Sequence, residues 1–327
     1  MKAVVASGPG GPEVLGLVER WSPQPDGTHV LVRIESASVN RADLEVRRGT
    51  VPGVRFPRIP GCECAGTVSE DPSGRLRPGQ KVVAFFGGMG RTYDGAYARF
   101  CAIRGDRVFA VRTDLEWTAL AAVPVAYLTA TGVLTDRLGL SAEHTLLVRG
   151  GGSAVGLAAI AIGHDAGATV IATTRSPDKV DRIRAVGADE VLIDDGAISE
   201  RVTGIVPGGV DRAIDLVGPA VLKDSLGACA QNGALCAAGT LGGLGGRRVR
   251  WALRALLERV SLTDYDVETA SYEATHERLQ SLADSVAAGR LPANIESVCG
   301  LDEVASVHKR MEENRNCGKL VLEMVNR

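Results

Sequence analysis

Aromatic residues, long apolar runs and closely spaced cysteines are scarce in this sequence. These scarcities argue against an aromatic core, a membrane-spanning helix and a cysteine-based framework. Phe, Trp and Tyr make up only 4% of the 327 residues, so the core must consist mainly of aliphatic side chains. No stretch approaches the roughly 18 consecutive apolar residues of a membrane-spanning helix, and we expect no membrane partner. The seven cysteines are scattered without a Cys-x-x-Cys pair, which argues against a disulfide framework and a structural zinc site.

A strong charge of either sign is also missing. The formal net charge at pH 7 is −2, so nothing favours a nucleic acid or an anionic surface as a partner. The apolar run at residues 3–6 is too short for a signal peptide and predicts a first strand instead. We therefore expect a cytoplasmic protein.

Glycine is abundant, with 40 residues, and the chain is long enough for two domains. Up to about residue 118, short strand-like segments are separated by Gly and Pro, with strands predicted at 30–34, 63–68 and 81–86. This pattern is typical of an all-β barrel or sandwich. A helical stretch at 115–138 follows it.

From residue 145 onward, strand-like and helix-like segments alternate. Strands are predicted at 145–148, 169–173, 190–193, 210–215 and 234–238, and helices at 154–166, 177–186 and 220–230. Such alternation indicates βαβ units, hence an α/β fold with a parallel sheet and helices on both faces. The tail, with helices at 247–260, 272–288 and 301–314 and a strand at 318–325, leaves this rhythm. We expect it to return to the first domain.

The glycine turn after the first of these strands is the most informative local motif. A strand, a glycine turn and a helix N-terminus bind the pyrophosphate of a dinucleotide through backbone N–H groups. In the register that keeps the last glycine, the turn reads Gly151-x-Ser153-x-x-Gly156, so a serine replaces the second glycine. The serine either crowds the phosphate with its Cβ or donates a hydrogen bond to it, and both alternatives stay open.

The end of the second strand indicates which dinucleotide binds. Folds that prefer NAD place Asp or Glu there to bind the ribose 2′-hydroxyl. Here Thr173, Thr174 and Arg175 end the strand, and Lys179 follows one turn later. Arginine and lysine attract a 2′-phosphate, so we predict NADPH as the cofactor. The alternative is that both cations are simply solvated charges at a helix start.

Several further motifs occur in order along nearly the whole chain. They are Ser38-Val39-Asn40-Arg41-Ala42-Asp43, Pro60-Gly61-Cys62-Glu63-Cys64-Ala65-Gly66, Gly95-Ala96-Tyr97-Ala98, Val186-Gly187-Ala188-Asp189 and Gly318-Lys319-Leu320-Val321-Leu322. With them the chain resembles the medium-chain dehydrogenase/reductase superfamily, in its zinc-free quinone oxidoreductase branch. The resemblance implies a Rossmann-type doubly wound parallel sheet for dinucleotide binding at 122–263. It also implies a discontinuous GroES-like β-barrel at 1–121 and 264–327 that binds the substrate.

The resemblance further implies that no metal is bound. Zinc-dependent members carry a cysteine where Asn40 stands, a histidine where Cys62 stands and a cysteine near Val125. A catalytic zinc needs three protein ligands, and Cys62 alone cannot supply them. We expect Cys62 and Cys64 to be small buried side chains, with a reactive thiol as the minor alternative.

Position by position, the resemblance implies roles for residues across the chain. Asn40 and Thr129 meet the nicotinamide end of the cofactor and, with the nearby phenol Tyr127, are the candidate catalytic residues. The other cofactor contacts implied are Gly151, Gly152, Ser153, Ala154, Val155 and Gly156 at the pyrophosphate, Thr173, Thr174, Arg175 and Lys179 at the adenosine, Val217, Gly218, Gly239, Thr240 and Leu241 after later strands, and Asn316 and Lys319 near the C-terminus.

One departure from the family limits the chemistry. Many quinone oxidoreductases and enoyl reductases have a tyrosine near Val51, and that candidate proton donor is missing. Asp43 and Tyr97 are expected to be structural. A reduced quinone oxyanion needs little acid catalysis, so NADPH-dependent reduction of a small quinone or activated enone ranks first. An enoyl thioester reductase ranks second, and a non-catalytic NADPH-binding sensor or partner-binding module is the alternative of another class. Relatives commonly form homodimers through an edge strand of the nucleotide domain, so the resemblance implies a homodimer.

Overall fold

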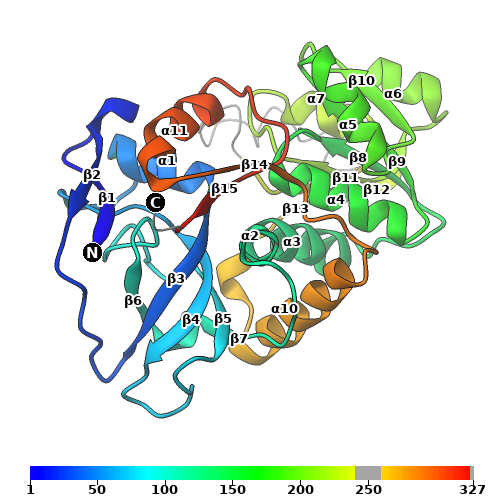
Figure 1. Cartoon of the computed structure of the whole chain (residues 1–327). Helices are drawn as coiled ribbons and strands as arrows, with labels where there is room; N and C mark the ends of the chain where they lie inside the picture. The colour runs from blue at the N-terminus through cyan, green and yellow to red at the C-terminus, as the bar shows by residue number, and fades with distance from the viewer. Residues whose placement is uncertain (240–258, 325–327) are drawn as a thin grey trace. The chain divides into compact units, whose positions relative to one another are not determined.

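The computed structural model describes residues 1–239 and 259–324, and the chain divides into two compact units (Figure 1). Unit 1 comprises Met1–Val125, Glu268–Gly289 and Ala293–Arg327, and unit 2 comprises Ala126–Val267 and Arg290–Pro292. None of the described helices is both long enough and apolar enough to cross a membrane. The division of substrate and dinucleotide binding at residues 121/122 and 263/264 stays a prediction.

Unit 2 is built on six parallel strands. In chain order they are β8 (Thr145–Arg149), β9 (Thr169–Thr174), β10 (Glu190–Ile193), β11 (Val210–Asp215), β12 (Cys229–Ala237) and β13 (Ser261–Asp264). In space they lie in the order β10-β9-β8-β11-β12-β13. Counted from the first strand, this is the 3-2-1-4-5-6 arrangement of a doubly wound sheet, which confirms the predicted fold class. The order reverses between β8 and β11, where such sheets bind ligands at the carboxyl ends of their strands.

The helices of unit 2 cover this sheet because their apolar residues face it. Helix α4 (Ala154–Asp165) packs on β8 and β9, and α5 (Val180–Ala185), preceded by η4 (Pro177–Lys179), packs on β10. Helix α6 (Ser199–Ile205) packs on α7 (Leu222–Gly227), which lies against β11 and β12. Leu147, Ile171 and Leu235 of the strands are fully buried in the resulting core.

Two predicted helices differ from the structure, and a third cannot be compared with it. The stretch predicted at 115–138 is broken into α2 (Trp117–Ala122), α3 (Pro124–Thr131) and the π-helical turn η3 (Gly132–Arg137). Pro124 has no N–H to continue the first helix, but it is well suited to begin the next. The helix predicted at 220–230 ends at Gly227, because the Ala228 carbonyl already accepts the Val210 N–H at 2.9 Å as β12 begins. The helix predicted at 247–260 lies almost wholly outside the described residues.

Unit 1 contains a seven-stranded sheet and a separate two-stranded ribbon. The ribbon is β1 (Lys2–Ala6) with β2 (Leu15–Glu19), and the sheet strands are β3 (His29–Val39), β4 (Glu63–Glu70), β5 (Lys81–Phe85), β6 (Phe100–Arg104), β7 (Val108–Ala110), β14 (Ile295–Cys299) and β15 (Lys319–Glu323). Their order is β14-β15-β3-β4-β5-β7, with β6 also paired to β3. Strand β15 is antiparallel to β3, with Leu320 opposite Val39, so the C-terminal segment returns to the N-terminal sheet (Figure 1).

Helices of three to 16 residues complete unit 1. They are η1 (Pro12–Val14), α1 (Arg41–Arg48), η2 (Gly105–Arg107), η5 (Val267–Thr269, at the unit boundary), α10 (Tyr272–Ala287), η6 (Leu301–Glu303) and α11 (Val304–Glu312). Helix α2 packs on β3, β4 and β15, and α1 packs on α11. Helix α1 therefore begins where β3 ends, beside the strand that brings Lys319 back from the far end of the sequence.

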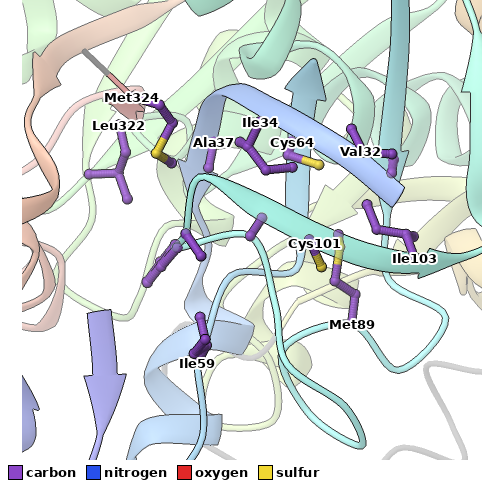
Figure 2. Close-up of a cluster of buried hydrophobic side chains, with 14 of the residues drawn as sticks. Val32, Ile34, Ala37, Ile59, Cys64, Met89, Cys101, Ile103, Leu322 and Met324 are labelled. Atoms are coloured by element: carbon purple, nitrogen blue, oxygen red, sulfur yellow. The ribbon is translucent and has the colours of Figure 1, made fainter. Parts of the chain in front are cut away.

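The core of unit 1 is aliphatic and sulfur-containing, as the low aromatic content predicts. Figure 2 shows Val32, Ile34 and Cys64 of the sheet packed close to Cys101 and Ile103 of β6. Cys64 is fully buried and Cys62 is 5% exposed, which confirms their prediction as buried side chains. Burial raises the pKa of both thiols, so they stay protonated and unreactive near neutral pH.

Candidate cofactor and catalytic site

The glycine turn between β8 and α4 is shaped by backbone crowding. Gly150 has a φ of 92°, a conformation that glycine adopts without strain. A Cβ on Gly156 would lie 2.4 Å from the Gly150 carbonyl oxygen and 2.8 Å from that of Gly151. Since neither carbonyl can move without breaking the turn, only glycine fits at position 156. The last glycine of the sequence motif is therefore required for helix α4 to start this close to β8.

Ser153 is the N-cap of α4. Its Oγ accepts the Gly156 N–H at 3.0 Å and donates its proton to the Gly150 carbonyl at 2.9 Å. Serine is a preferred N-cap because its oxygen satisfies one of the helix N–H groups that lack an intrahelical acceptor. The sequence offered crowding or donation to phosphate as alternatives. The structure gives the hydroxyl a third role, in which both its proton and its acceptor capacity hold the turn together.

Three N–H groups of the turn are left without an acceptor among the described residues. They belong to Gly152, Ala154 and Val155, all half-buried at the N-terminus of the 12-residue helix α4. The N–H groups and the dipole of such a helix favour an anion. A dinucleotide pyrophosphate fits this cradle, because it offers acceptor oxygens to donors that the described residues leave unpaired.

The residues at the end of β9 divide into buried and exposed ones. Thr173 is fully buried, and its hydroxyl donates to Asp194 at 3.1 Å and accepts the Gly150 N–H at 3.2 Å. This geometry makes it a support for the glycine turn, and its predicted contact with cofactor stays a prediction. The Thr174 hydroxyl bonds within the turn to Ser176. Arg175 is exposed and has no ion pair or hydrogen bond with any described residue.

A buried ionic cluster, which was not predicted from the sequence, lies at the carboxyl ends of β8, β10 and β11. The Arg149 side chain is fully buried and forms a bidentate pair with Asp194, at 2.8 and 2.9 Å. Its third nitrogen donates to Asp224 at 2.8 Å and to Ser225 at 2.9 Å. Although burial disfavours the charge, the hydrogen bonds and charges of these carboxylates raise the pKa of Arg149. The one signal for this cluster in the sequence is a lone arginine, Arg149, at the end of the otherwise apolar strand β8.

Asp215 shapes the turn after β11. Its Oδ1 accepts the N–H groups of Val217 and Gly218, each at 2.8 Å, and its Oδ2 accepts the Ser225 hydroxyl at 2.6 Å. Burial raises the pKa of Asp215 against these hydrogen bonds. Val217 and Gly218 thus lie at the carboxyl edge of the sheet as predicted from the sequence, although no ligand contact follows from that. A Cβ on Gly239 would lie 2.4 Å from the Leu216 carbonyl, and Thr240 and Leu241 lie outside the described residues.

The two candidates on α3 differ in what their side chains can do. Thr129 is half-buried, and its hydroxyl makes no hydrogen bond with a described residue. Tyr127 is 1% exposed, and its hydroxyl donates to the Pro292 carbonyl. A phenol whose proton is held by a backbone carbonyl is poorly placed to release it to a substrate. The geometry therefore argues against the catalytic role predicted for Tyr127 and leaves Thr129 available.

In unit 1, Asn40 lies at the centre of a polar group. Its Nδ2 donates to Glu63 at 2.9 Å, and its Oδ1 accepts from the Lys319 ammonium at 2.7 Å. Lys319 also donates to the same Glu63 oxygen at 2.6 Å, and the other Glu63 oxygen accepts the Val125 N–H at 2.7 Å. Glu63 is fully buried and Lys319 is 2% exposed, whereas Asn40 is half-buried. Of the three, only the asparagine reaches the surface of unit 1.

A second chain of hydrogen bonds leads from Asp43 into the core. Asp43 accepts the N–H groups of Asn40 and Cys62, at 2.8 and 3.0 Å, which confirms its predicted structural role. The Tyr97 hydroxyl lies 3.2 Å from Asp43 and 3.1 Å from His308 Nε2. A neutral His308 that donates from Nε2 to the Tyr97 oxygen lets Tyr97 donate to the Asp43 carboxylate. In this arrangement His308, Tyr97 and Asp43 each have a hydrogen-bond partner. Tyr97 is fully buried, as expected for a structural residue.

The two titratable ends of this chain respond to pH in opposite directions. Burial, reinforced by the Arg47 charge, lowers the pKa of His308 to about 3. Burial also raises the pKa of Asp43 to about 6, against the hydrogen bonds that it accepts. The folded state therefore takes up a proton on Asp43 as the pH falls, but resists one on His308. The two groups change the free energy of unfolding in opposite directions and partly cancel between pH 4 and 6. The pH dependence of wild-type stability therefore does not separate them.

We expect His308→Phe to isolate the histidine contribution. In the wild type, the folded pKa of about 3 lies below the usual 6.5, so this contribution to stability is complete above pH 6.5 and is lost as the pH falls. Between pH 7 and pH 5 the wild type should lose about 2 kcal/mol relative to the variant. Urea unfolding of both proteins at each pH measures this difference. A difference that does not change with pH would contradict a neutral, buried His308.

The remaining predicted residues lie near the start of β15 or away from the network. The Asn316 amide donates to the Gly318 carbonyl at 3.1 Å, so it braces the turn before β15. Val51 is half-buried after α1 and carries no proton to donate. Lys179 is half-buried in η4, on the element that follows Arg175. For Asn316 and Lys179, contact with a cofactor stays a prediction.

The donor atoms near Asn40 do not fit a zinc ion. Asn40 Oδ1 already accepts a lysine ammonium, and a second cation there would be repelled. The Cys62 thiol has a raised pKa, whereas zinc binds the thiolate. Within the described parts of the chain, no three His, Cys, Asp or Glu side chains form a group that could hold a metal. Activity without a metal ion stays a prediction.

Comparisons with known proteins agree with this architecture. Residues 26–113 match the family described as alcohol dehydrogenase GroES-like domain, and residues 186–322 match the family described as zinc-binding dehydrogenase. A quinone oxidoreductase of Lama guanicoe is 27% identical over 336 residues, covering 98% of this chain and 97% of its own. An acrylyl-CoA reductase of Ruegeria pomeroyi is 31% identical over 222 residues, covering 66% and 67%. A mycobacterial protein solved in complex with NADPH is 27% identical with a TM-score of 0.89, covering 99% and 100%.

A GroES-like sheet unit joined to a 3-2-1-4-5-6 parallel sheet defines an oxidoreductase of the alcohol dehydrogenase type. Within this class, the chain belongs to the medium-chain dehydrogenase/reductase superfamily, in its quinone oxidoreductase-like branch. The resemblance found in the sequence motifs is thereby confirmed.

Proposed function

We propose that this protein is an NADPH-dependent oxidoreductase that reduces a small quinone or an activated enone without a metal ion. The observation that carries the proposal is the pairing of two features of unit 2. After β8 lies an anion cradle with three N–H groups that no described residue accepts. After β9, where an NAD-binding fold has a carboxylate, stands the exposed Arg175, which also has no partner in the described part of the chain. The relatives named quinone oxidoreductase and the mycobacterial neighbour with NADPH support it.

Each part of the chain has a separate task in this proposal. The N–H groups of Gly152, Ala154 and Val155 hold the pyrophosphate, and Arg175 with Lys179 holds the 2′-phosphate. Asn40 and Thr129 meet the nicotinamide end. Bound NADPH supplies the hydride, which is the chemistry that the cofactor brings.

The acceptor class follows from the missing proton donor. Val51 has no acidic proton to donate, and the Tyr127 hydroxyl donates its proton to the Pro292 carbonyl. A reduced quinone oxyanion is stable enough to take its proton from solvent, whereas an enoyl thioester needs a placed donor. Quinones and activated enones therefore rank first. Because one relative is an acrylyl-CoA reductase, an enoyl thioester is the second candidate.

The experiment that tests the function measures NADPH oxidation with quinones, enones and enoyl thioesters. Turnover with the first two classes supports the proposal, and a preference for thioesters supports the second candidate. Tight NADPH binding without turnover on any acceptor would instead indicate a non-catalytic binding protein. A homodimer stays a prediction as well, and β13 stands at the end of the described strand order of its sheet, as an edge strand would.

We expect Arg175→Ala to weaken NADPH binding by about 1–3 kcal/mol, roughly 5- to 150-fold, because a charge-assisted contact to the 2′-phosphate is lost. NADH binding should change less than about twofold, since NADH has no such phosphate. Titration of both cofactors measures the two constants. Arg184→Ala is a matched control, because Arg184 is also exposed and lies on the neighbouring helix α5. Equal losses for NADPH and NADH would disprove the assignment.

A further inference from the structure

The buried Glu63–Lys319 ion pair contacts the side-chain amide of Asn40. The pair contacts both ends of one amide: Glu63 accepts from Asn40 Nδ2 at 2.9 Å, and Lys319 donates to Asn40 Oδ1 at 2.7 Å. Carboxylates only accept and ammonium groups only donate. If the amide turned by 180°, its NH2 would face the ammonium and its oxygen would face the carboxylate. The two charges therefore select one orientation of the Asn40 amide.

The pair is itself fixed, so it can act as a rigid support. Glu63 lies on β4 and is held through its second oxygen by the Val125 N–H at 2.7 Å. Lys319 begins β15, and its own N–H donates to the Asn294 carbonyl at 2.9 Å. The register places Leu320 opposite Val39, which brings Lys319 next to Asn40. The Asn40 backbone N–H is held independently by Asp43.

Burial decides which of the three residues can meet a ligand. Glu63 is fully buried and Lys319 is 2% exposed, and every contact of the Lys319 ammonium is to protein oxygen. The resemblance implied that Lys319 meets the cofactor, but an ammonium that is buried and bound to two protein acceptors is not available for that contact. Asn40, half-buried, remains the one member of the group that a ligand can reach on unit 1.

We propose that Glu63 and Lys319 are positioning residues, which orient the Asn40 amide for the reaction. The inference rests on the proposed function, in which Asn40 meets the nicotinamide end of NADPH. An asparagine free to rotate would present either a donor or an acceptor at the same place, and only one of these is productive. The ion pair removes the unproductive state before any ligand arrives.

The decisive variant is the neutral double substitution Glu63→Gln with Lys319→Met. The oxygen of the introduced glutamine can still accept the Val125 N–H, and its NH2 then faces Asn40. The Asn40 oxygen should therefore turn toward this glutamine and its NH2 toward the introduced methionine. We expect thermal unfolding and the Kd for NADPH to stay close to wild type, because no buried charge is left unpaired. The kcat for a quinone acceptor should fall about 10- to 100-fold.

A cycle with Asn40→Ala separates positioning from a structural effect. Asn40→Ala alone should lower kcat by a similar factor, and the triple variant should lose no more than the larger single effect. Wild-type kcat in the double variant, or multiplicative losses in the triple variant, would overturn the proposal. Glu63→Asp with Lys319→Arg, which keeps both charges, should recover part of the rate.

A measurement without turnover makes the orientation testable by itself. In protein labelled with 15N-asparagine, the Asn40 side-chain amide protons should show nuclear Overhauser effects to the Glu63 side chain in the wild type. In the double variant these effects should move to the methyl group of the introduced methionine. An unchanged pattern would overturn the inference even if quinone turnover is found. If wild-type protein turns over no acceptor, the proposed function fails while the amide orientation is still decided by the spectrum.

Discussion

Arg149→Met lowers the free energy of unfolding by about 3–5 kcal/mol at neutral pH, the loss expected when one partner of a buried ion pair is removed. The guanidinium is fully buried and donates to Asp194, Asp224 and Ser225 at 2.8–2.9 Å. Its removal leaves carboxylates at the carboxyl edge of the sheet without their counter-charge. Asp194 also holds Thr173, which in turn accepts the Gly150 N–H, so NADPH affinity should fall together with stability.

Arg201→Met is the matched control for this prediction. Arg201 pairs with Asp195 at 2.6 Å, one residue from Asp194, but its side chain is 39% exposed and that of Asp195 is 67% exposed. Exposed pairs contribute less than about 1 kcal/mol, so the control should change little. Urea unfolding of both variants gives the comparison. Similar losses for the two arginines would contradict the buried cluster as a determinant of stability.

Lys319→Met is the second substitution with a large expected effect, a loss of about 3–5 kcal/mol. The fully buried Glu63 carboxylate would lose its only cationic partner among the described residues, 2.6 Å away, and keep only the neutral donors Asn40 and Val125. Adding Glu63→Gln should restore most of the stability, since the unpaired charge is then removed.

The same measurement on Arg315→Met provides the reference for a surface pair in this segment. Arg315 pairs with Glu313, and the two side chains are 62% and 41% exposed. We expect a change of less than about 1 kcal/mol for this variant. If Lys319→Met were no more destabilising than Arg315→Met, the Glu63 charge would have to be satisfied by its neutral donors alone, and the ion pair would not be a structural requirement.

Much of the fold could be predicted because its signals are local. The alternation of strand-like and helix-like segments from residue 145 onward gave the parallel sheet, and β10 and β11 were placed with their observed bounds. The errors fell at element ends. Pro124 divides a stretch that looked continuous, and Cys229 begins β12 because its neighbour Ala228 pairs with Val210. Pairing with another strand decides such boundaries, and a one-dimensional pattern does not contain it.

The candidate site was predictable in part for the same reason. A glycine turn and the residues that end a strand are contiguous in sequence, so Gly156 and Arg175 could be singled out. The capping role of Ser153 was also within reach, because a serine three residues before a helical N–H is a known N-cap pattern. The glycine motif instead favoured an interpretation in which Ser153 contacts the phosphate. The reassignment of Tyr127 and Lys319, in contrast, needed the positions of Pro292, Glu63 and Asn40.

The sequence by itself determined the kind of protein: an aliphatic core, a doubly wound sheet, a glycine turn before a helix, and a strand end with an arginine in place of a carboxylate. These features follow from composition, from the alternation of segments and from short motifs, which are all properties of the linear chain. Only the tertiary structure decided how the charges inside are neutralised. Arg149 meets Asp194 across 45 positions, and Lys319 meets Glu63 across 256. A buried charge is stable only beside its partner, and the fold alone sets which residue that is.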